Sequence, residues 1–231
     1  MALDIYLISL NRFFVGDYTS PLEAAFGDKA VRVGSDKAQM TADEATAYVS
    51  ELQEDLSDEF QVDCTWEDRA EEDYCCEQFD YDAFLCLQAY AANLDFPIKS
   101  GLRRQPVDFD PEEHTENHPG IEKIWNGADT RFQHLVIHAC NCGIWVPASF
   151  DSPVPLDEEG NLIAGSSQRL LEELSILNGE LGVTKLWDEL ADGEAICDED
   201  DPLGIVKYGY AMMFCYAKKS VEKNLPIVFD G

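Results

Sequence analysis

The stretch DPLGIVKYGYAMMFCYAKKSVEKNLPIVF, residues 201–229, predicts a long apolar helix followed at once by a β-strand. Asp201 is a typical N-cap residue, and Pro202 suits the first position of a helix. Lysines gather near the far end, where the helix dipole favours cations, and Asn224 ends the helix. The remaining LPIVF is short and apolar, which favours a strand. A mostly buried helix beside a strand indicates a protein that packs helices on a sheet.

Three more helices are predicted upstream. Thr41 and Glu44 form a capping box ahead of an apolar stripe, so we expect a helix over residues 41–57. Ser166 or Ser167 caps another helix over residues 164–179, which carries a leucine stripe and ends at Asn178-Gly179. Residues 82–94 have few polar positions and predict a largely buried helix. Apolar or alternating runs predict strands over residues 3–10, 29–33 and 59–66.

These elements favour the α+β class, with a mixed or antiparallel central sheet packed with about four to five helices. The length suits a single domain over residues 1–231. The polar stretch 95–120 contains four prolines and is the best candidate for a subdivision. It would separate an acidic, helix-rich half, residues 1–94, from a half with a hairpin and two helices, residues 121–231.

The stretch HLVIHACNCGIWVP, residues 134–147, predicts a tight hairpin in which strands 134–140 and 143–150 flank the turn NCG. A regular strand would place His134, His138 and Cys140 on one face, with a rise of ~3.3 Å per residue. His134 would then lie too far from Cys140 to share a metal. His138, Cys140 and Cys142 remain as candidate metal ligands or thiol groups, but the second ligand pair that structural zinc normally uses is missing. A core hairpin is the main interpretation, and we expect no cofactor.

The charge of the chain is strongly negative. The 46 acidic residues exceed the 16 basic ones by 30, which gives a formal net charge of −30. Such a surface repels nucleic acid and anionic membranes and attracts basic proteins. Residues 51–82 contain fourteen acidic residues against one arginine, and residues 188–201 contain eight acidic residues and no basic one. We therefore expect a basic protein partner and no direct binding to nucleic acid or membranes.

The first of these acidic stretches also carries aromatic residues, which often anchor interfaces. Two interpretations stay open: a recognition surface for a basic partner, or a solvated face that only keeps the protein soluble. In the first interpretation the candidate partner-binding residues are Glu54, Asp55, Asp58, Glu59, Asp63, Trp66, Glu67, Asp68, Glu71, Glu72 and Asp73.

The N-terminal MALDIYLISL lacks the basic start of a secretory signal, and its apolar run is interrupted by Asp4. No stretch reaches the ~20 apolar residues that a membrane-spanning helix needs. We expect a cytoplasmic protein whose eight cysteines are reduced.

The ordered motifs HACNCGIWVPASF, GSSQRLLEEL and KYGYAMMFCYAKKSVEKNLPIVF resemble the pattern of a family of small bacterial proteins without an assigned activity. The resemblance covers roughly residues 130–231 and speaks for fold more than for chemistry. The family pattern has acidic residues around the turn where this chain has Cys140 and Cys142. Proteins of this general style include immunity and accessory proteins of bacterial conflict systems.

The sequence thus favours a non-catalytic, highly acidic protein that binds a basic protein partner, of the immunity or inhibitor type. One alternative is a thiol- or metal-dependent enzyme that uses His138, Cys140 and Cys142. Another is a protein whose carboxylates imitate the phosphates of DNA, which requires regular carboxylate spacing on one exposed face.

Overall fold

A computed structural model describes residues 2–26, 40–69, 71, 74–98, 109–115, 118–138, 143–157, 162–190, 195–197 and 200–230. Its centre is a six-stranded sheet in the order β2-β1-β6-β3-β5-β4. The β3–β5 pair is parallel and the other pairs are antiparallel, so the sheet is mixed. The strands are β1 Ala2–Leu7, β2 Cys75–Asp80, β3 Gly143–Val146, β4 Val154–Pro155, β5 Ile163–Ser166 and β6 Ile227–Asp230.

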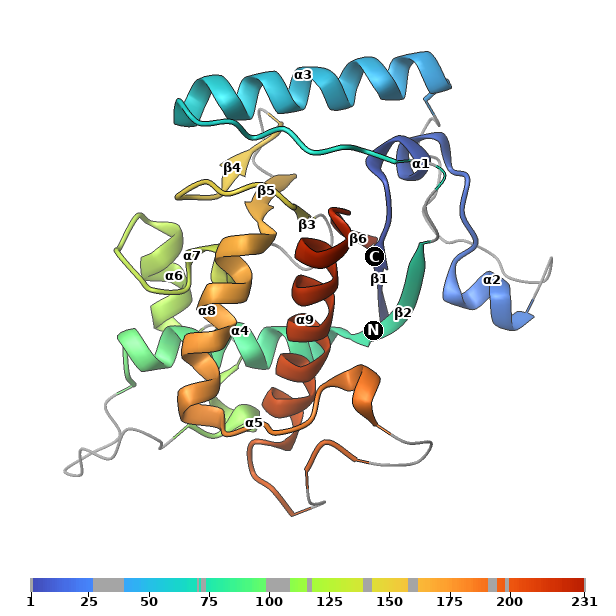
Figure 1. The fold of residues 1–231 in the computed structure, drawn as a ribbon. Coiled ribbons are helices and arrows are strands. Elements are labelled where there is room, and N and C mark those ends of the chain that lie inside the picture. The colour runs from blue at the N-terminus through green and yellow to red at the C-terminus, as the bar shows by residue number, and fades with distance from the viewer. Residues whose placement is uncertain are drawn as a thin grey trace.

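Helices cover both faces of this sheet (Figure 1). One face packs on α4 Tyr81–Asp95, α8 Ser167–Leu181 and α9 Gly204–Lys223, and the other packs on α1 Leu10–Val15 and α3 Ala42–Phe60. Shorter elements complete the described chain: α2 Pro21–Phe26, α5 Pro111–His114, α6 Pro119–Trp125, α7 Gln133–Val136 and the 3-10 helix η2 Trp187–Glu189.

Alternation along the strands explains the two buried layers. In β1, Ile5 and Leu7 belong to the core under α4, α8 and α9, whereas Tyr6 belongs to the core under α3. Successive side chains of a strand point to opposite faces, so a strand that is buried on both sides is apolar throughout. By the same alternation in β6, Phe229 belongs to the core under α4, α8 and α9, and Val228 belongs to the core under α3.

The predicted α+β class with a mixed sheet is confirmed, and five of the described helices have seven residues or more. The predicted helix 41–57 is confirmed as α3, whose Thr41–Glu44 capping box makes both of its hydrogen bonds. The C-terminal helix also exists, and Asn224 ends it with a positive φ of 57°. It begins at Gly204, however, because Asp201 forms a turn with Leu203 instead of capping the helix.

The predicted strand 59–66 is wrong. Helix α3 continues to Phe60, and Gln61 then reverses the chain with a φ of 53°. Cys64 and Trp66 are buried as a strand would require, but Val62 is exposed and no strand forms here. The polar stretch 95–120 contains the short helix α5 and the start of α6.

The predicted hairpin at 134–147 is also wrong. Residues 133–136 form the short helix α7, and β3 pairs with β5 and β6 instead of with the chain before it. Residues 139–142 lie outside the described residues, as does the predicted strand 29–33. Strands β2, β4 and β5 were not predicted.

Both ends of the chain meet in the sheet, where Asp4 of β1 is the register partner of Asp230 of β6. The sheet therefore draws strands from both sides of the stretch 95–120. A single domain over residues 1–231 stays a prediction. None of the described helices is both long and apolar enough to cross a membrane.

Candidate functional site

Helix α3 lies on the outside of the molecule, across the sheet face that it covers (Figure 1). Its buried side consists of Ala45, Val49, Leu52 and Leu56, at the spacing of one helix face. All seven of its acidic residues are exposed, and residues 41–68 as a whole contain ten acidic residues and no Lys or Arg. The exposed acids of α3 are Asp43, Glu44, Glu51, Glu54, Asp55, Asp58 and Glu59.

After α3 the chain runs back along the helix over residues 61–69, which we call the return segment. Gln53 donates from Nε2 to the carbonyl of Trp66 at 2.8 Å, and the Ser57 hydroxyl accepts from the backbone N–H of Cys64 at 3.0 Å. Gln53 and Ser57 are four residues apart, which is ~6 Å along a helix. Their partners Trp66 and Cys64 are two residues apart, which is ~6.6 Å along an extended chain, so the two spacings match. The return segment therefore lies antiparallel beside α3.

The return segment is fixed at its end by Asp68. The Asp68 carboxylate accepts hydrogen bonds from the backbone N–H groups of Leu10 and Asn11, both at 2.8 Å, and from the Ser9 hydroxyl at 2.9 Å. These groups form the start of α1, where free N–H groups favour an anion. Asp68 thus joins the return segment to α1.

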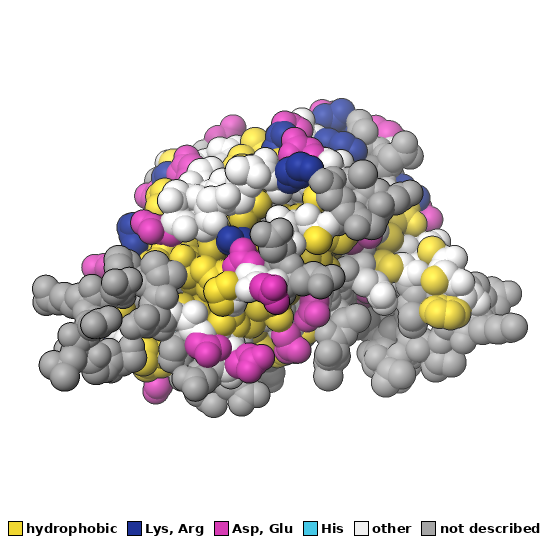
Figure 2. All heavy atoms as spheres, turned by 90° about the horizontal axis from the view of Figure 1, so that it is seen from below, with side chains coloured by type: hydrophobic (Ala, Val, Ile, Leu, Met, Phe, Trp, Pro, Cys, Tyr) yellow, Lys and Arg dark blue, Asp and Glu magenta, His cyan; other side chains and the backbone are white. Residues whose placement is uncertain are grey.

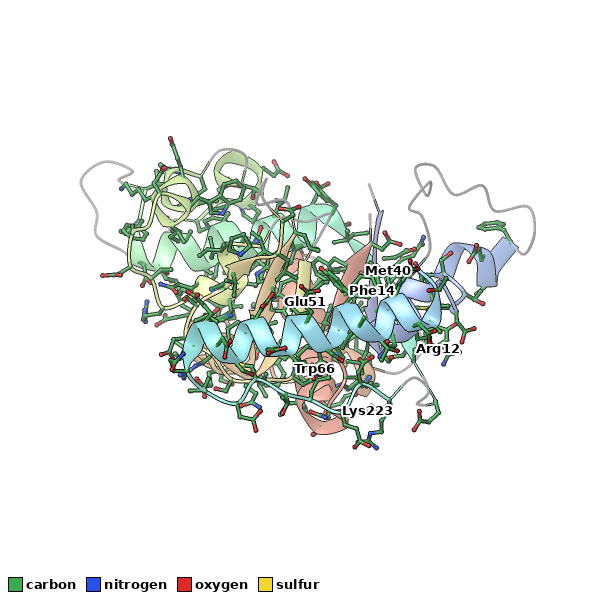
Figure 3. The ribbon with its side chains drawn as sticks, turned by 90° about the horizontal axis from the view of Figure 1, so that it is seen from above. Arg12, Phe14, Met40, Glu51, Trp66 and Lys223 are labelled. Carbon is green, nitrogen blue, oxygen red and sulfur yellow. The ribbon has the colours of Figure 1, made fainter. Side chains whose placement is uncertain are left out.

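Contacts divide the surface of α3 into distinct sides. Thr46, Ser50, Gln53 and Ser57 follow one another at three- and four-residue spacing, so they share the side that faces the return segment. Seen from above, Glu51 and Trp66 lie on opposite sides of the helix (Figure 3). Glu51 and the acids three, four or seven residues from it therefore occupy the side that faces away from both the sheet and the return segment; these are Glu44, Glu54, Asp55 and Asp58.

We call the seven exposed acids of α3, together with Asp63 and Glu67 of the return segment, the acidic ridge. Glu51 to Glu59 places five carboxylates along ~12 Å of helix axis, or about one per 3 Å. One strand of B-DNA carries about one charge per 3.4 Å of axis. The linear charge density of this part of the ridge is therefore that of a DNA strand.

The ridge charges are largely uncompensated. Between described residues, no Lys or Arg forms an ion pair with an acid of α3, and Glu67 meets Arg69 at 3.4 Å in an exposed pair. Hydrogen bonds from Thr41 lower the pKa of Glu44, and hydrogen bonds from Thr65 lower the pKa of Asp63. Both groups are thus held in the charged form at neutral pH.

The second acidic stretch, residues 188–201, differs in its local partners. Asp201 pairs with Lys207 at 2.6 Å, and Asp188 pairs with Lys219 at 3.3 Å. Four of its eight acids lie outside the described residues. Figure 2 shows the face opposite α3, where Lys and Arg side chains are visible among Asp and Glu. The acidic ridge is therefore the better candidate for a purely anionic surface.

The predicted partner-binding residues fall into several groups. Glu54, Asp55, Asp58, Glu59, Asp63, Glu67 and Glu71 are exposed, and all but Glu71 belong to the ridge. Trp66 is only 6% exposed and packs in the core under α3, and Asp68 is engaged with α1, so neither is free to meet a partner. Glu72 and Asp73 lie outside the described residues. The role of these residues in partner binding stays a prediction. The structure adds three further exposed acids of α3 to the candidates: Asp43, Glu44 and Glu51.

The histidines of the 134–147 stretch are core residues. His138 is fully buried and stacks on Trp145 with ring centroids 4.0 Å apart. Burial lowers the pKa of His134 to about 4 and that of His138 to about 3, so both rings are neutral at pH 7. The strand spacing assumed between His134 and Cys140 is wrong because residues 133–136 are helical.

The metal and thiol interpretations rest on residues that the structure describes only in part. Cys140 and Cys142 lie outside the described residues. Among the residues that are described, no group of three or more His, Cys, Asp and Glu side chains could hold a metal ion. The six described cysteines are all free thiols.

The motifs that suggested a bacterial family build the fold. The Ser166 hydroxyl caps α8 and donates to the carbonyl of Ala148, and Ser167 donates to the carbonyl of Trp145. A Cβ on Gly165 would lie 2.5 Å from Cε1 of His138, so this position admits only glycine without a shift. These residues fix the junction of β5 with α8.

Comparison with known proteins gives one family. No curated protein and no solved structure matches the chain significantly. Residues 1–229 match the family described as "Putative DNA-mimic protein". The match extends over the acidic first half, which the resemblance seen in residues 130–231 does not include. Because the match spans nearly the whole chain, the protein belongs to this putative DNA-mimic protein family.

Proposed function

We propose that the protein binds a DNA-binding protein through the acidic ridge and occupies the surface that would otherwise hold DNA. The observation that carries this proposal is the row of unpaired carboxylates from Glu51 to Glu59, whose density is that of a DNA strand. The family match supports the DNA-mimic alternative over the immunity or inhibitor type. The same features support a non-catalytic role.

The carboxylates of the acidic ridge are held in fixed positions, which favours recognition by a partner in addition to their charge. Helix α3 is held by four buried apolar residues, and the return segment is tied to α3 and α1 by hydrogen bonds. A partner thus meets charges on a preorganised backbone, which lowers the entropy lost on binding. Lysine and arginine side chains of a DNA-binding surface would pair with these carboxylates as they pair with phosphates.

The test is capture on immobilised protein from a lysate of the cells that make it. Retained proteins should be DNA-binding proteins, and duplex DNA should release them at constant salt because it competes for the same surface. Raising the salt concentration should also release them. Retained proteins that do not bind DNA, or that duplex DNA does not displace, would contradict the proposal.

Matched charge variants locate the surface. The ridge variant carries Glu51→Gln, Glu54→Gln, Asp55→Asn and Asp58→Asn. The control variant carries Glu122→Gln, Asp129→Asn, Glu180→Gln and Glu222→Gln, which are exposed acids elsewhere. Both variants lose four negative charges, so net charge alone cannot separate them. Capture should fail with the ridge variant and persist with the control variant. Equal loss of capture in both variants would show that binding depends on the net charge of the protein and not on the acidic ridge.

A further inference from the structure

A cavity of about 290 Å³ lies between α8 and residues 130–134. Its lining contains Arg131 and Arg169 together with three acidic residues, Asp151, Glu172 and Glu173. The volume is near the lower end of small-molecule sites. Helix α8 covers the sheet face opposite α3, so the cavity is separate from the acidic ridge.

Glu173 gives the cavity a buried carboxylate that forms no ion pair with a described residue. Its side chain is 7% exposed, and its two oxygens accept from the backbone N–H groups of His134 and Leu135 at 2.8 and 2.9 Å. Burial raises the pKa of Glu173 to about 8, although these two hydrogen bonds act in the opposite direction. A cation in the cavity would offset the cost of the buried charge.

The same cavity is lined by side chains whose N–H donors lack acceptors. His134 is 1% exposed, and its Nδ1 accepts from the N–H of Ser166 at 3.0 Å, so the neutral ring carries its proton on Nε2. The carbonyls of Phe150 and Asp151 act on this ring as weak acceptors, and Nε2 has no partner that meets the full geometry of a hydrogen bond. Nε of Arg169 also lacks an acceptor. Buried donors of this kind point to a ligand oxygen.

We propose that this cavity binds a free amino acid, with its ammonium group towards Glu173 and its carboxylate towards the N–H donors of His134 and Arg169. A zwitterion matches a lining that carries both signs of charge. Arg169 is already paired with Asp151 at 2.6 Å and with Glu172 at 2.9 Å, and Arg131 is paired with Asp95 at 2.6 Å. The groups of the lining that a ligand can satisfy are therefore one carboxylate, that of Glu173, and the N–H donors of His134 and Arg169. Ile176, which is 48% exposed, provides an apolar wall for the ligand's side chain.

Calorimetric titration of the intact protein at pH 8 tests this site. The probes are L-leucine, L-glutamine and L-arginine, with butylamine and butyrate as ligands of a single charge. At least one amino acid should bind tenfold or more tightly than both single-charge ligands. Binding of none of the three, or equal binding of butylamine or butyrate, would overturn the proposal.

Two variants and one control assign the binding to the cavity. Glu173→Gln removes the buried charge and should weaken binding tenfold or more, whereas Glu180→Gln, exposed on the same helix, should change nothing. Ile176→Phe narrows the cavity from an exposed position and gives a second test if the Glu173 variant does not fold. Binding should also tighten about fivefold from pH 7 to pH 8 as Glu173 ionises, and Glu173→Gln should lose this dependence. Unchanged affinity in both cavity variants would contradict the assignment.

Discussion

Gln53 of α3 donates a hydrogen bond from its side-chain amide to the backbone carbonyl of Trp66, 2.8 Å away and 13 residues later in the chain. Gln53 lies midway along α3, so this bond holds the return segment beside the middle of the helix. The positions of Asp63 and Glu67 relative to the helix carboxylates depend on it.

Gln53→Ala should loosen the return segment. The loss of one partly buried hydrogen bond costs about 1 kcal/mol of the free energy of unfolding. Backbone amides of residues 61–69 should exchange their hydrogens faster, while those of α8 keep their protection. Gln78→Ala, an exposed position on β2, is the control and should change neither. Unaltered exchange in the return segment would show that this bond does not hold it.

Asp68 and Glu67 are sequence neighbours with different roles, and truncation should separate them. Asp68→Ala leaves the first N–H groups of α1 without their acceptor, so the free energy of unfolding should fall by about 2 kcal/mol. Glu67→Ala removes an exposed side chain and should cost less than about 0.5 kcal/mol. Urea denaturation measures both, and equal effects would contradict the role given to Asp68.

Two glycines should respond to alanine with opposite signs. Gly165→Ala places a Cβ 2.5 Å from Cε1 of His138 and 2.7 Å from Cδ1 of Trp145, so it should destabilise the protein by about 1–3 kcal/mol. Gly179 lies in α8 with nothing within 4 Å of its Cβ position, and Gly179→Ala should stabilise by about 0.5–1 kcal/mol. Thermal unfolding of both variants checks the sign; a neutral Gly165→Ala would contradict the packing.

The raised pKa of Glu173 predicts a pH dependence of stability. The folded state keeps this proton up to about pH 8, whereas the unfolded chain loses it near pH 4.3. The stability that this group contributes is therefore complete below pH 4.3 and is lost as the pH rises to 8, with a slope of up to about 1.4 kcal/mol per pH unit. The difference in free energy of unfolding between the wild type and Glu173→Gln should change along this window. A difference that is constant from pH 5 to pH 8 would contradict the raised pKa.

Local signals in the sequence predicted some elements correctly. The capping box of Thr41 and Glu44 and the αL residue Asn224 act within one turn of chain, so α3 and the end of α9 could be predicted. The sequence offers no local signal that the predicted hairpin at 134–147 is wrong. The first N–H groups of α7 are bonded by Glu173, which lies 39 residues further along the chain from His134.

In the candidate site, too, some features can be predicted from the sequence and others depend on contacts between distant residues. The density of acids in residues 41–68 is visible in the sequence, and it predicts an anionic surface. Sequence spacing does not distinguish Glu67, which is exposed, from Asp68, which is bonded to α1. It also does not reveal that Asp188 and Asp201 of the second acidic stretch have lysine partners, since these lie on α9.

The most direct test of the central claim is a competition titration. A DNA-binding protein captured by the wild type is purified and bound to a fluorescent duplex, and the acidic protein is added at fixed salt. We expect the wild type and the control variant to displace the duplex with the same midpoint, and the variant with Glu51, Glu54, Asp55 and Asp58 changed to amides to need at least tenfold more protein. A ternary complex of DNA, DNA-binding protein and acidic protein, or equal midpoints for the ridge and control variants, would contradict it.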